Sequence, residues 1–108
     1  MFKYNRCLTM CVIKVAKVGD VRTKLCVSAK DKSLALFRIK GEYYCIDNYC
    51  PHLYGPLCEG QRNGFVVTCP WHGSKFDVRD GSLKAPPARV GVKTHKVTVK
   101  EGSIFVHV

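Results

Sequence analysis

Cys50-Pro51-His52 and Cys69-Pro70-Trp71-His72 are the two stretches of this 108-residue chain that decide its fold and its chemistry. Each stretch holds one cysteine and one histidine, separated by one residue in the first and by two in the second. Thiolates and imidazoles are the usual protein ligands of zinc and of iron–sulfur clusters. The doubled pattern therefore predicts a metal cofactor that both stretches hold.

Spacing alone leaves several interpretations of these four side chains open. Buried cysteines and hydrogen-bonded histidines would need no metal, but four of them would rarely fall in this register by chance. A nucleophilic cysteine needs one base and not a second Cys–His pair. A zinc site also takes two cysteines and two histidines, but finger-type spacing places like residues together. A [2Fe–2S] cluster, with both cysteines on one iron and both histidines on the other, fits the mixed stretches best, and zinc is its strongest rival.

The residues around the two pairs extend the pattern over three segments: Cys50-Pro51-His52-Leu53-Tyr54-Gly55-Pro56-Leu57, Cys69-Pro70-Trp71-His72-Gly73-Ser74-Lys75-Phe76-Asp77, and the stretch from Gly81 to Pro86-Pro87-Ala88. With these segments the chain resembles the soluble Rieske-type ferredoxins. The resemblance is most specific over residues 41–88 and extends from about residue 12 to the C-terminus. It implies one Rieske [2Fe–2S] cluster per chain, with the histidines at the solvent edge and the ligands Cys50, His52, Cys69 and His72.

The mixed ligands set the electrical charge of such a cluster. Two ferric ions, two sulfides and two thiolates cancel, so the oxidised centre with neutral imidazoles is neutral and the reduced centre is singly negative. Replacing two of four thiolates with imidazole therefore raises the reduction potential, to between about −150 and +300 mV. Because the other ring nitrogens carry protons, we expect this potential to fall above the pKa of the oxidised state.

Residues beside the ligands place the potential within that range, because hydrogen bonds to sulfur stabilise the reduced cluster. In the high-potential Rieske proteins of respiratory complexes, a Ser and a Tyr after the second histidine bond sulfur through their hydroxyls. This chain keeps Ser74 but has Phe76 in place of the Tyr. We therefore expect a low-potential, ferredoxin-like centre, with the Ser74 hydroxyl bonded either to sulfur or to the backbone of its own loop.

The two stretches must be held without the disulfide of the respiratory type, since its cysteine positions correspond to Gly55 and Trp71 here. The resemblance implies that packing takes over, through Leu53, Leu57 and Trp71. Pro86 and Pro87 would form a third, rigid cover over the cluster, and a plain connector is the alternative.

The rest of the chain predicts short β-strands. Apolar or alternating runs cover residues 12–18, 25–29, 34–39, 43–47, 65–69, 75–78, 93–100 and 104–108, with no long helical period. Short turns make neighbouring strands antiparallel. We expect an all-β, Rieske-type antiparallel sandwich or barrel, as a single domain over residues 1–108 with basal sheets from about 11–46 and 88–108. The resemblance, and not the periodicity, implies that residues of about 47–87 are inserted as a small cluster-binding subdomain.

The net charge of +10, from 18 basic and 8 acidic residues, is unevenly distributed. Residues 47–87 hold four acids and four bases, so the cluster tip is neutral, whereas residues 1–46 carry +7 and residues 88–108 carry +3. This excess either orients the chain toward acidic partners or only solvates the strand faces. Without a basic stripe or a row of stacking aromatics, nucleic-acid binding is not expected.

The remaining cysteines fit no disulfide framework. Cys7, Cys11, Cys26 and Cys45 lie outside the cluster region, and Cys58 is expected to be a small apolar filler near the cluster. An odd total of seven cysteines, with cluster thiolates that must stay available, favours a reducing compartment. Residues 8–13 are too short for a signal core, and nothing approaches a membrane span. We expect a soluble protein of the cytoplasm or an organelle matrix.

The length of the chain restricts its function. A chain of 108 residues has no room for a second catalytic module, such as the two-histidine, one-carboxylate iron domain of a ring-hydroxylating oxygenase. His95 and His107 are expected to be core or surface residues of strands. The leading hypothesis is a monomeric one-electron carrier, without a catalytic site, between a flavin-containing reductase and a terminal oxygenase or other acceptor. The alternatives are a fixed subunit of a larger oxidoreductase, like the small subunit of nitrite reductase, a redox sensor, and a zinc-bound module.

Overall fold

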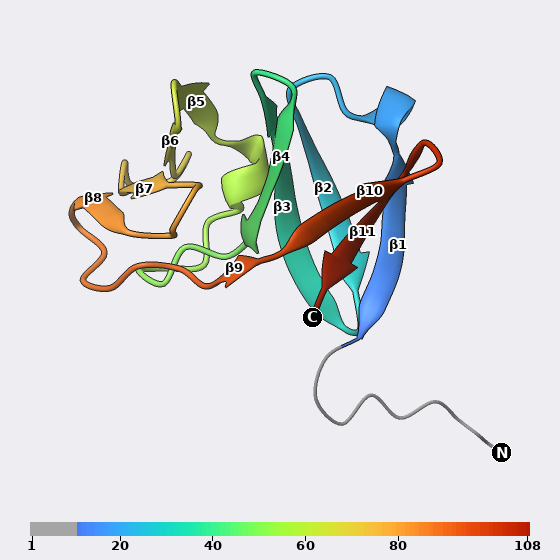
Figure 1. Cartoon of the computed structure of the whole chain (residues 1–108). Helices are drawn as coiled ribbons and strands as arrows, with labels where there is room; N and C mark the ends of the chain where they lie inside the picture. The colour runs from blue at the N-terminus through green and yellow to red at the C-terminus, as the bar shows by residue number, and fades with distance from the viewer. Residues whose placement is uncertain (1–10) are drawn as a thin grey trace, which may run out of the picture.

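The computed structural model describes residues 11–108, which form three antiparallel sheets (Figure 1). The first basal sheet has the order β1 (Val12–Lys17), β11 (Ser103–His107), β10 (Val97–Lys100), and the second has the order β2 (Lys24–Ala29), β3 (Lys32–Ile39), β4 (Glu42–Asp47), β9 (Thr94–His95). The third sheet has the order β5 (Gln61–Asn63), β6 (Val66–Thr68), β7 (Lys75–Asp77), β8 (Leu83–Ala85). Two 3₁₀ turns, η1 (Val18–Asp20) and η2 (Leu57–Glu59), complete the elements, and no helix within residues 11–108 is long and apolar enough to cross a membrane. The prediction of an all-β antiparallel fold is confirmed.

Residues with positive φ form the tight hairpins of the second basal sheet. Lys30 and Asp31 (φ 52° and 65°) join β2 to β3, and Lys40 and Gly41 (φ 54° and 82°) join β3 to β4. Two successive left-handed residues give a turn whose twist matches the twist of the strands. The turns set the register of β2, β3 and β4 and thereby decide which side chains of β3 face each side of the sheet.

Strand β3 separates two hydrophobic cores, because its side chains are buried on both faces. Leu34 and Leu36 lie in the basal core with residues of β1 and β11, whereas Ala35 and Phe37 lie in the second core. The second core also contains residues of the third sheet and of the segments around it, among them Cys50, Leu57, Cys58, Val67, Cys69 and Phe76. The prediction that the chain is one domain stays a prediction, which this shared strand supports.

The run predicted as one strand over residues 93–100 divides into two. β9 pairs with β4 in the second basal sheet, and after Lys96 the chain continues as β10, which pairs with β11 in the first (Figure 1). Hydrophobic alternation does not reveal this change of sheet, because side chains continue to alternate between the two faces when a strand passes from one sheet to another. The prediction also lacked β5 and β8.

Candidate metal centre

The first pair of candidate ligands lies in a short closed loop, residues 50–55, between β4 and η2 (the first loop). The Cys50 amide donates a hydrogen bond to the carbonyl of Gly55 (2.9 Å), and the Tyr54 amide donates one to the carbonyl of Cys50 (2.7 Å). The backbone of the loop thus closes on itself. The Cys50 and His52 side chains project from one fixed frame.

The second pair lies in a loop with the same hydrogen-bond pattern, residues 69–74, between β6 and β7 (the second loop). The Cys69 amide donates to the carbonyl of Ser74 (2.7 Å), and the Gly73 amide donates to the carbonyl of Cys69 (3.1 Å). The fifth residue of each loop, Tyr54 or Gly73, has a positive φ, of 64° and 85° respectively. The loops therefore correspond residue by residue, with the histidine in third position in the first loop and in fourth position in the second.

The two loops group the four candidate ligands into two pairs. Cys50 and Cys69 are buried (0% and 3% exposed) and form no disulfide. The rings of His52 and His72 have centroids 5.0 Å apart at an interplanar angle of 88°, and His72 is exposed. Within residues 11–108, no three His, Cys, Asp or Glu side chains are grouped as the ligands of one ion. Two buried sulfurs and two outer imidazoles instead give the two-plus-two division that a two-iron cluster requires.

Polar atoms of the site fit a bound cluster. The Nδ1 atom of His52 is buried and has no hydrogen-bond partner in the protein, as expected of a nitrogen that binds metal. Burial raises the pKa of the Cys50 thiol, the His52 backbone lowers it, Cys69 raises it further and the Ser74 hydroxyl lowers it. Because a metal cation stabilises thiolates, it would oppose the effect of burial. The donor set therefore fits a cluster held by sulfur on the buried side and by nitrogen on the outer side.

Gly55 allows the two loops to approach each other. A Cβ atom at this position would lie 2.6 Å from the Sγ of Cys69 and 3.1 Å from the Cγ of Trp71. The second loop therefore leaves no room for a side chain at position 55. Leu57 is fully buried in the core beneath the loops, whereas Leu53 and Trp71 are half exposed (50% and 57%).

Ser74 connects the second loop to the segment that follows β8. Its side chain is fully buried, and its Oγ accepts a hydrogen bond from the Ala88 amide (2.9 Å). Pro86 and Pro87, joined by a cis peptide bond, are exposed next to buried Ala88. The Ser74 hydroxyl also lowers the pKa of the Cys50 thiol, although burial raises that pKa more strongly. The backbone group that the Ser74 side chain bonds therefore belongs to residue 88 and not to its own loop.

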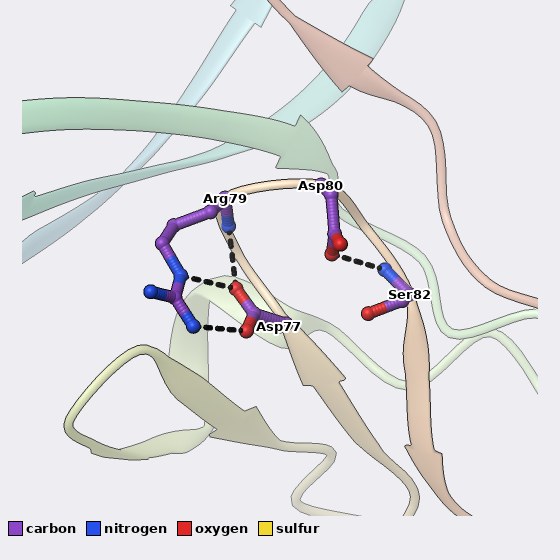
Figure 2. A network of polar contacts seen from close by, with 4 residues as sticks. All are labelled: Asp77, Arg79, Asp80 and Ser82. Carbon is purple, nitrogen blue, oxygen red and sulfur yellow. Dashed lines mark hydrogen bonds and ion pairs between the residues drawn. The ribbon is translucent and has the colours of Figure 1, made fainter.

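The turn between β7 and β8 is held by a polar network that the sequence analysis did not identify (Figure 2). Buried Asp77 accepts hydrogen bonds from the backbone N, Nε and Nη2 of Arg79 (2.9, 3.0 and 2.7 Å), and Asp80 accepts one from the Ser82 amide (2.9 Å). These bonds, that from the Arg79 side chain first, hold the pKa of Asp77 below its ordinary value. The sequence predicts the turn itself from Asp80-Gly81, but it does not show that Asp77 and Arg79 are paired within it.

Cys58 is not an apolar filler, because it forms a disulfide with Cys26, 32 residues earlier in the chain. The prediction that the cysteines fit no framework is therefore wrong for this pair. Cys26 lies in β2 and Cys58 in η2, and they become neighbours only when η2 packs on the second basal sheet, which spacing does not reveal. Cys45 is a buried free thiol, Cys11 is buried, and Cys7 lies outside the described residues.

The histidines outside the two loops have other partners. His95 is buried, and its Nε2 lies 2.7 Å from Oδ1 of Asp47. The Nε2 of His107 lies 2.6 Å from Oγ1 of Thr98. As expected, both are core or surface residues of the basal strands β9 and β11.

Known families and proteins are similar to this chain over most of its length. The model of the Rieske [2Fe-2S] domain matches residues 9–96. The ferredoxin component of the p-cumate 2,3-dioxygenase system of Pseudomonas putida is 38% identical over 95 residues, which cover 87% of this chain and 78% of that protein. Ferredoxin CarAc of Metapseudomonas resinovorans is 32% identical over 99 residues, which cover 92% of this chain and 91% of that protein.

Solved structures share the fold. The Sphingomonas yanoikuyae B1 ferredoxin superposes with a TM-score of 0.82 at 30% identity, covering 87% of this chain and 95% of that one. A chain of the complex of reduced oxygenase and oxidised ferredoxin in carbazole 1,9a-dioxygenase superposes with a TM-score of 0.82 at 32% identity, covering 88% of this chain and 91% of that one.

Proposed function

This chain belongs to the Rieske [2Fe-2S] domain family, and from that premise we propose that Cys50 and Cys69 bind one iron of its cluster while His52 and His72 bind the other. The predicted cofactor, a Rieske-type [2Fe–2S] cluster, is confirmed by the family. The predicted function of a one-electron carrier is confirmed as well, because the relatives are ferredoxin components of dioxygenase systems.

The observation that carries the ligand assignment is the division of four side chains into a buried sulfur pair and an outer imidazole pair. When bound, the cluster supplies a centre that accepts and releases one electron. The buried sulfurs of Cys50 and Cys69 keep water from the inner side of that centre. Exposed His72 brings the outer side to the protein surface, and electrons enter and leave there.

We infer a reduction potential low in the Rieske range, because few hydroxyl groups are available to bond the cluster sulfurs. We infer that the Ser74 hydroxyl, which lowers the pKa of the Cys50 thiol, donates to that sulfur and stabilises the reduced centre. Phe76 is fully buried in the same core and offers no second hydroxyl. The centre is therefore expected to have a ferredoxin-like reduction potential. The Ser74 hydroxyl raises this potential, whereas Phe76 has no hydroxyl that could raise it further.

Exposed apolar side chains around the histidines form the surface at which a redox partner docks. Leu53, Tyr54 and Trp71 are 50%, 69% and 57% exposed, and they belong to the two loops that carry the ligands. A carbazole dioxygenase ferredoxin has been solved in complex with its oxygenase. We infer an acceptor of that class, a terminal oxygenase, and a flavin-containing reductase as the donor. The net charge of +10 favours acidic partners.

In this proposal the chain is a monomeric carrier without a catalytic site of its own, in the cytoplasm or an organelle matrix. The alternative is a fixed subunit of a larger oxidoreductase, such as the small subunit of nitrite reductase. Many of those subunits lack the ligands, whereas all four are present here. A complex with the acceptor that survives gel filtration in 1 M salt would favour the fixed subunit, and dissociation would favour the carrier.

Electron paramagnetic resonance of the dithionite-reduced protein tests the proposal most directly. We expect the low average g value of a nitrogen-ligated two-iron cluster, together with two irons and two sulfides per chain and no zinc. A colourless protein with one zinc per chain would contradict it. Transfer of electrons to a purified oxygenase, followed by stopped-flow absorbance, then tests the partner class.

A further inference from the structure

The Cys26–Cys58 disulfide joins one exposed and one buried cysteine. Cys26 is exposed on β2, the edge strand of the second basal sheet, whereas Cys58 is 4% exposed and belongs to the core that contains Cys50 and Cys69. A disulfide is opened by thiolate attack on an accessible sulfur. Its two ends therefore differ in reactivity, and Cys26 is the end that a reagent reaches from solvent.

We propose that Cys26–Cys58 is a thiol-exchange site, at which a small acidic thiol of the glutathione class forms a mixed disulfide with Cys26 and releases the Cys58 thiol. This modification goes beyond the electron-transfer function. An acidic thiol suits the site because residues 1–46, which include β2, carry a net charge of +7. Lys24, two residues from Cys26 on the same strand, places its ammonium group at the boundary with η2, where it donates to the carbonyl of Gly60 (2.6 Å).

The reaction balances without any further oxidant. The thiolate RS⁻ attacks the Sγ of Cys26, the bond to Cys58 breaks, and the Sγ of Cys58 leaves with the electron pair and takes up one proton. A second RS⁻ then attacks the R sulfur of the mixed disulfide, which releases the Cys26 thiolate to be protonated. In total two RSH are oxidised to RSSR, and the Cys26–Cys58 pair gains two electrons and two protons.

Opening of the disulfide removes a covalent anchor of the first ligand loop. The amides of Leu57 and Cys58 in η2 donate to the backbone carbonyl and the Oδ1 of Asn48 (both 2.7 Å), and Asn48 lies two residues before Cys50. The disulfide fixes η2, and with it this end of the first loop, to β2. After reduction only hydrogen bonds and packing hold η2 in place. This second consequence rests on the proposed ligand set, whereas the exchange reaction does not.

A pair of matched variants tests the exchange site. Cys58→Ser leaves the exposed thiol of Cys26, and Cys26→Ser leaves the buried thiol of Cys58. We expect oxidised glutathione to modify Cys26 in the first variant at least about tenfold faster than Cys58 in the second, because only Cys26 is accessible. Mass spectrometry of the peptides that contain each residue measures both rates. Equal rates, or an unreactive Cys26, would overturn the proposal.

The unmodified protein supplies the second measurement. Reduced glutathione should open the disulfide in the folded holoprotein, so that Cys26 and Cys58 become alkylated while buried Cys45 does not. Cys45 is a suitable internal control because burial, with a further effect of Asp47, raises its pKa to about 12. Alkylation of Cys26 only together with Cys45, in denaturant, would show that the disulfide is purely structural.

Loss of cluster absorbance in a chelator measures the consequence for the first loop. We expect the loss to be several-fold faster after the disulfide is opened, and equally fast in the Cys26→Ser variant. An unchanged rate would overturn the coupling to the loop but not the exchange reaction. If the protein binds no cluster at all, the ligand assignment fails, and the exchange reaction is still decided by the two variants.

Discussion

The two ligand loops share one backbone but are anchored in different ways. The first loop runs from β4 to η2, and its base is fixed to the second basal sheet, because Asn48 Nδ2 donates to Ser33 Oγ (3.0 Å) and the disulfide holds η2 to β2. The second loop joins β6 to β7 within one hairpin, in which Val67 pairs with Phe76. The two loops thus share one local backbone conformation. Contacts with residues distant in the sequence determine how the loops are placed relative to each other.

The position of the histidine is the second difference between the loops. Residue 52 of the first loop corresponds to Trp71 of the second, and residue 53 corresponds to His72. One imidazole therefore belongs to the third residue of its loop and the other to the fourth residue. The two rings pack edge to face with their centroids 5.0 Å apart. Equivalent frames with the histidine at different positions thus bring the two imidazoles together from opposite loops.

Moving the first histidine by one residue should have the largest effect. In the double variant His52→Leu with Leu53→His, the composition is unchanged, but the imidazole starts at the half-exposed position 53. We expect almost no cluster, because the variant lacks the buried Nδ1 atom of His52. Iron, sulfide and the paramagnetic signal of the reduced protein measure this. The single variant Leu53→His, which keeps His52, should retain the cluster, and a loaded double variant would show that the offset is unimportant.

The close approach of the loops can be tested with two glycines. Gly55→Ala would place a methyl group 2.6 Å from the sulfur of Cys69, a proposed ligand, so we expect a loss of about 1–3 kcal/mol of stability and little cluster. Gly73→Ala is the matched control. Its Cβ meets no atom within 4 Å, but the positive φ of 85° costs about 1–2 kcal/mol.

Urea unfolding and iron content together separate these two effects. Both glycine variants should unfold at lower urea, but only Gly55→Ala should lose the cluster. If Gly73→Ala lost as much cluster as Gly55→Ala, loop conformation and not the contact between the loops would be limiting.

Ser74→Ala should have a smaller effect and act on the potential. Ser74 corresponds to Gly55 in the first loop, so only the second loop offers a hydroxyl at this position. Without it, the reduced centre loses a hydrogen bond to Cys50 sulfur, and we expect the midpoint potential to fall by an amount on the order of 60 mV. The unpaired Ala88 amide should also cost about 1–3 kcal/mol.

Protein-film voltammetry measures the midpoint potential of the Ser74→Ala variant. Ser74→Thr, which keeps the hydroxyl, is the matched control and should retain most of the wild-type value. An unchanged potential in Ser74→Ala would limit the serine to its bond with Ala88.

Sequence patterns predicted the parts of this molecule that depend on local chemistry. The candidate ligand pairs are visible because each Cys and His lies within four residues of its partner, and most of the strands are visible because alternation is local. The disulfide is formed by residues 32 apart, and the switch from β9 to β10 leaves the alternation unchanged. Both features are set by packing between elements that are distant in the sequence. A short stretch of sequence therefore does not predict them.

The equivalence of the two loops also escaped the sequence analysis. Tyr54 adopts the left-handed conformation that Gly73 adopts in the second loop. A tyrosine in a sequence does not predict a positive φ, because non-glycine residues rarely adopt one. The different spacing of Cys and His further hides the common frame. Only the pair of hydrogen bonds in each loop reveals it.

Acid should weaken the anchorage of the second loop, with the smallest effect of the four. Asp77 ends β7, which carries the second loop, and its pKa is lowered mainly by the hydrogen bond from Arg79. A carboxyl whose folded-state pKa is depressed contributes stability above its unfolded pKa of about 3.9, and that stability is lost as pH falls through the folded-state pKa. Because Arg79 is half exposed, we expect the thermal midpoint to fall by only about 1–2 °C more than in Asp77→Asn between pH 5 and pH 3. Calorimetry of both proteins without cluster measures this, and parallel pH profiles would remove Asp77 from the anchorage of the second loop.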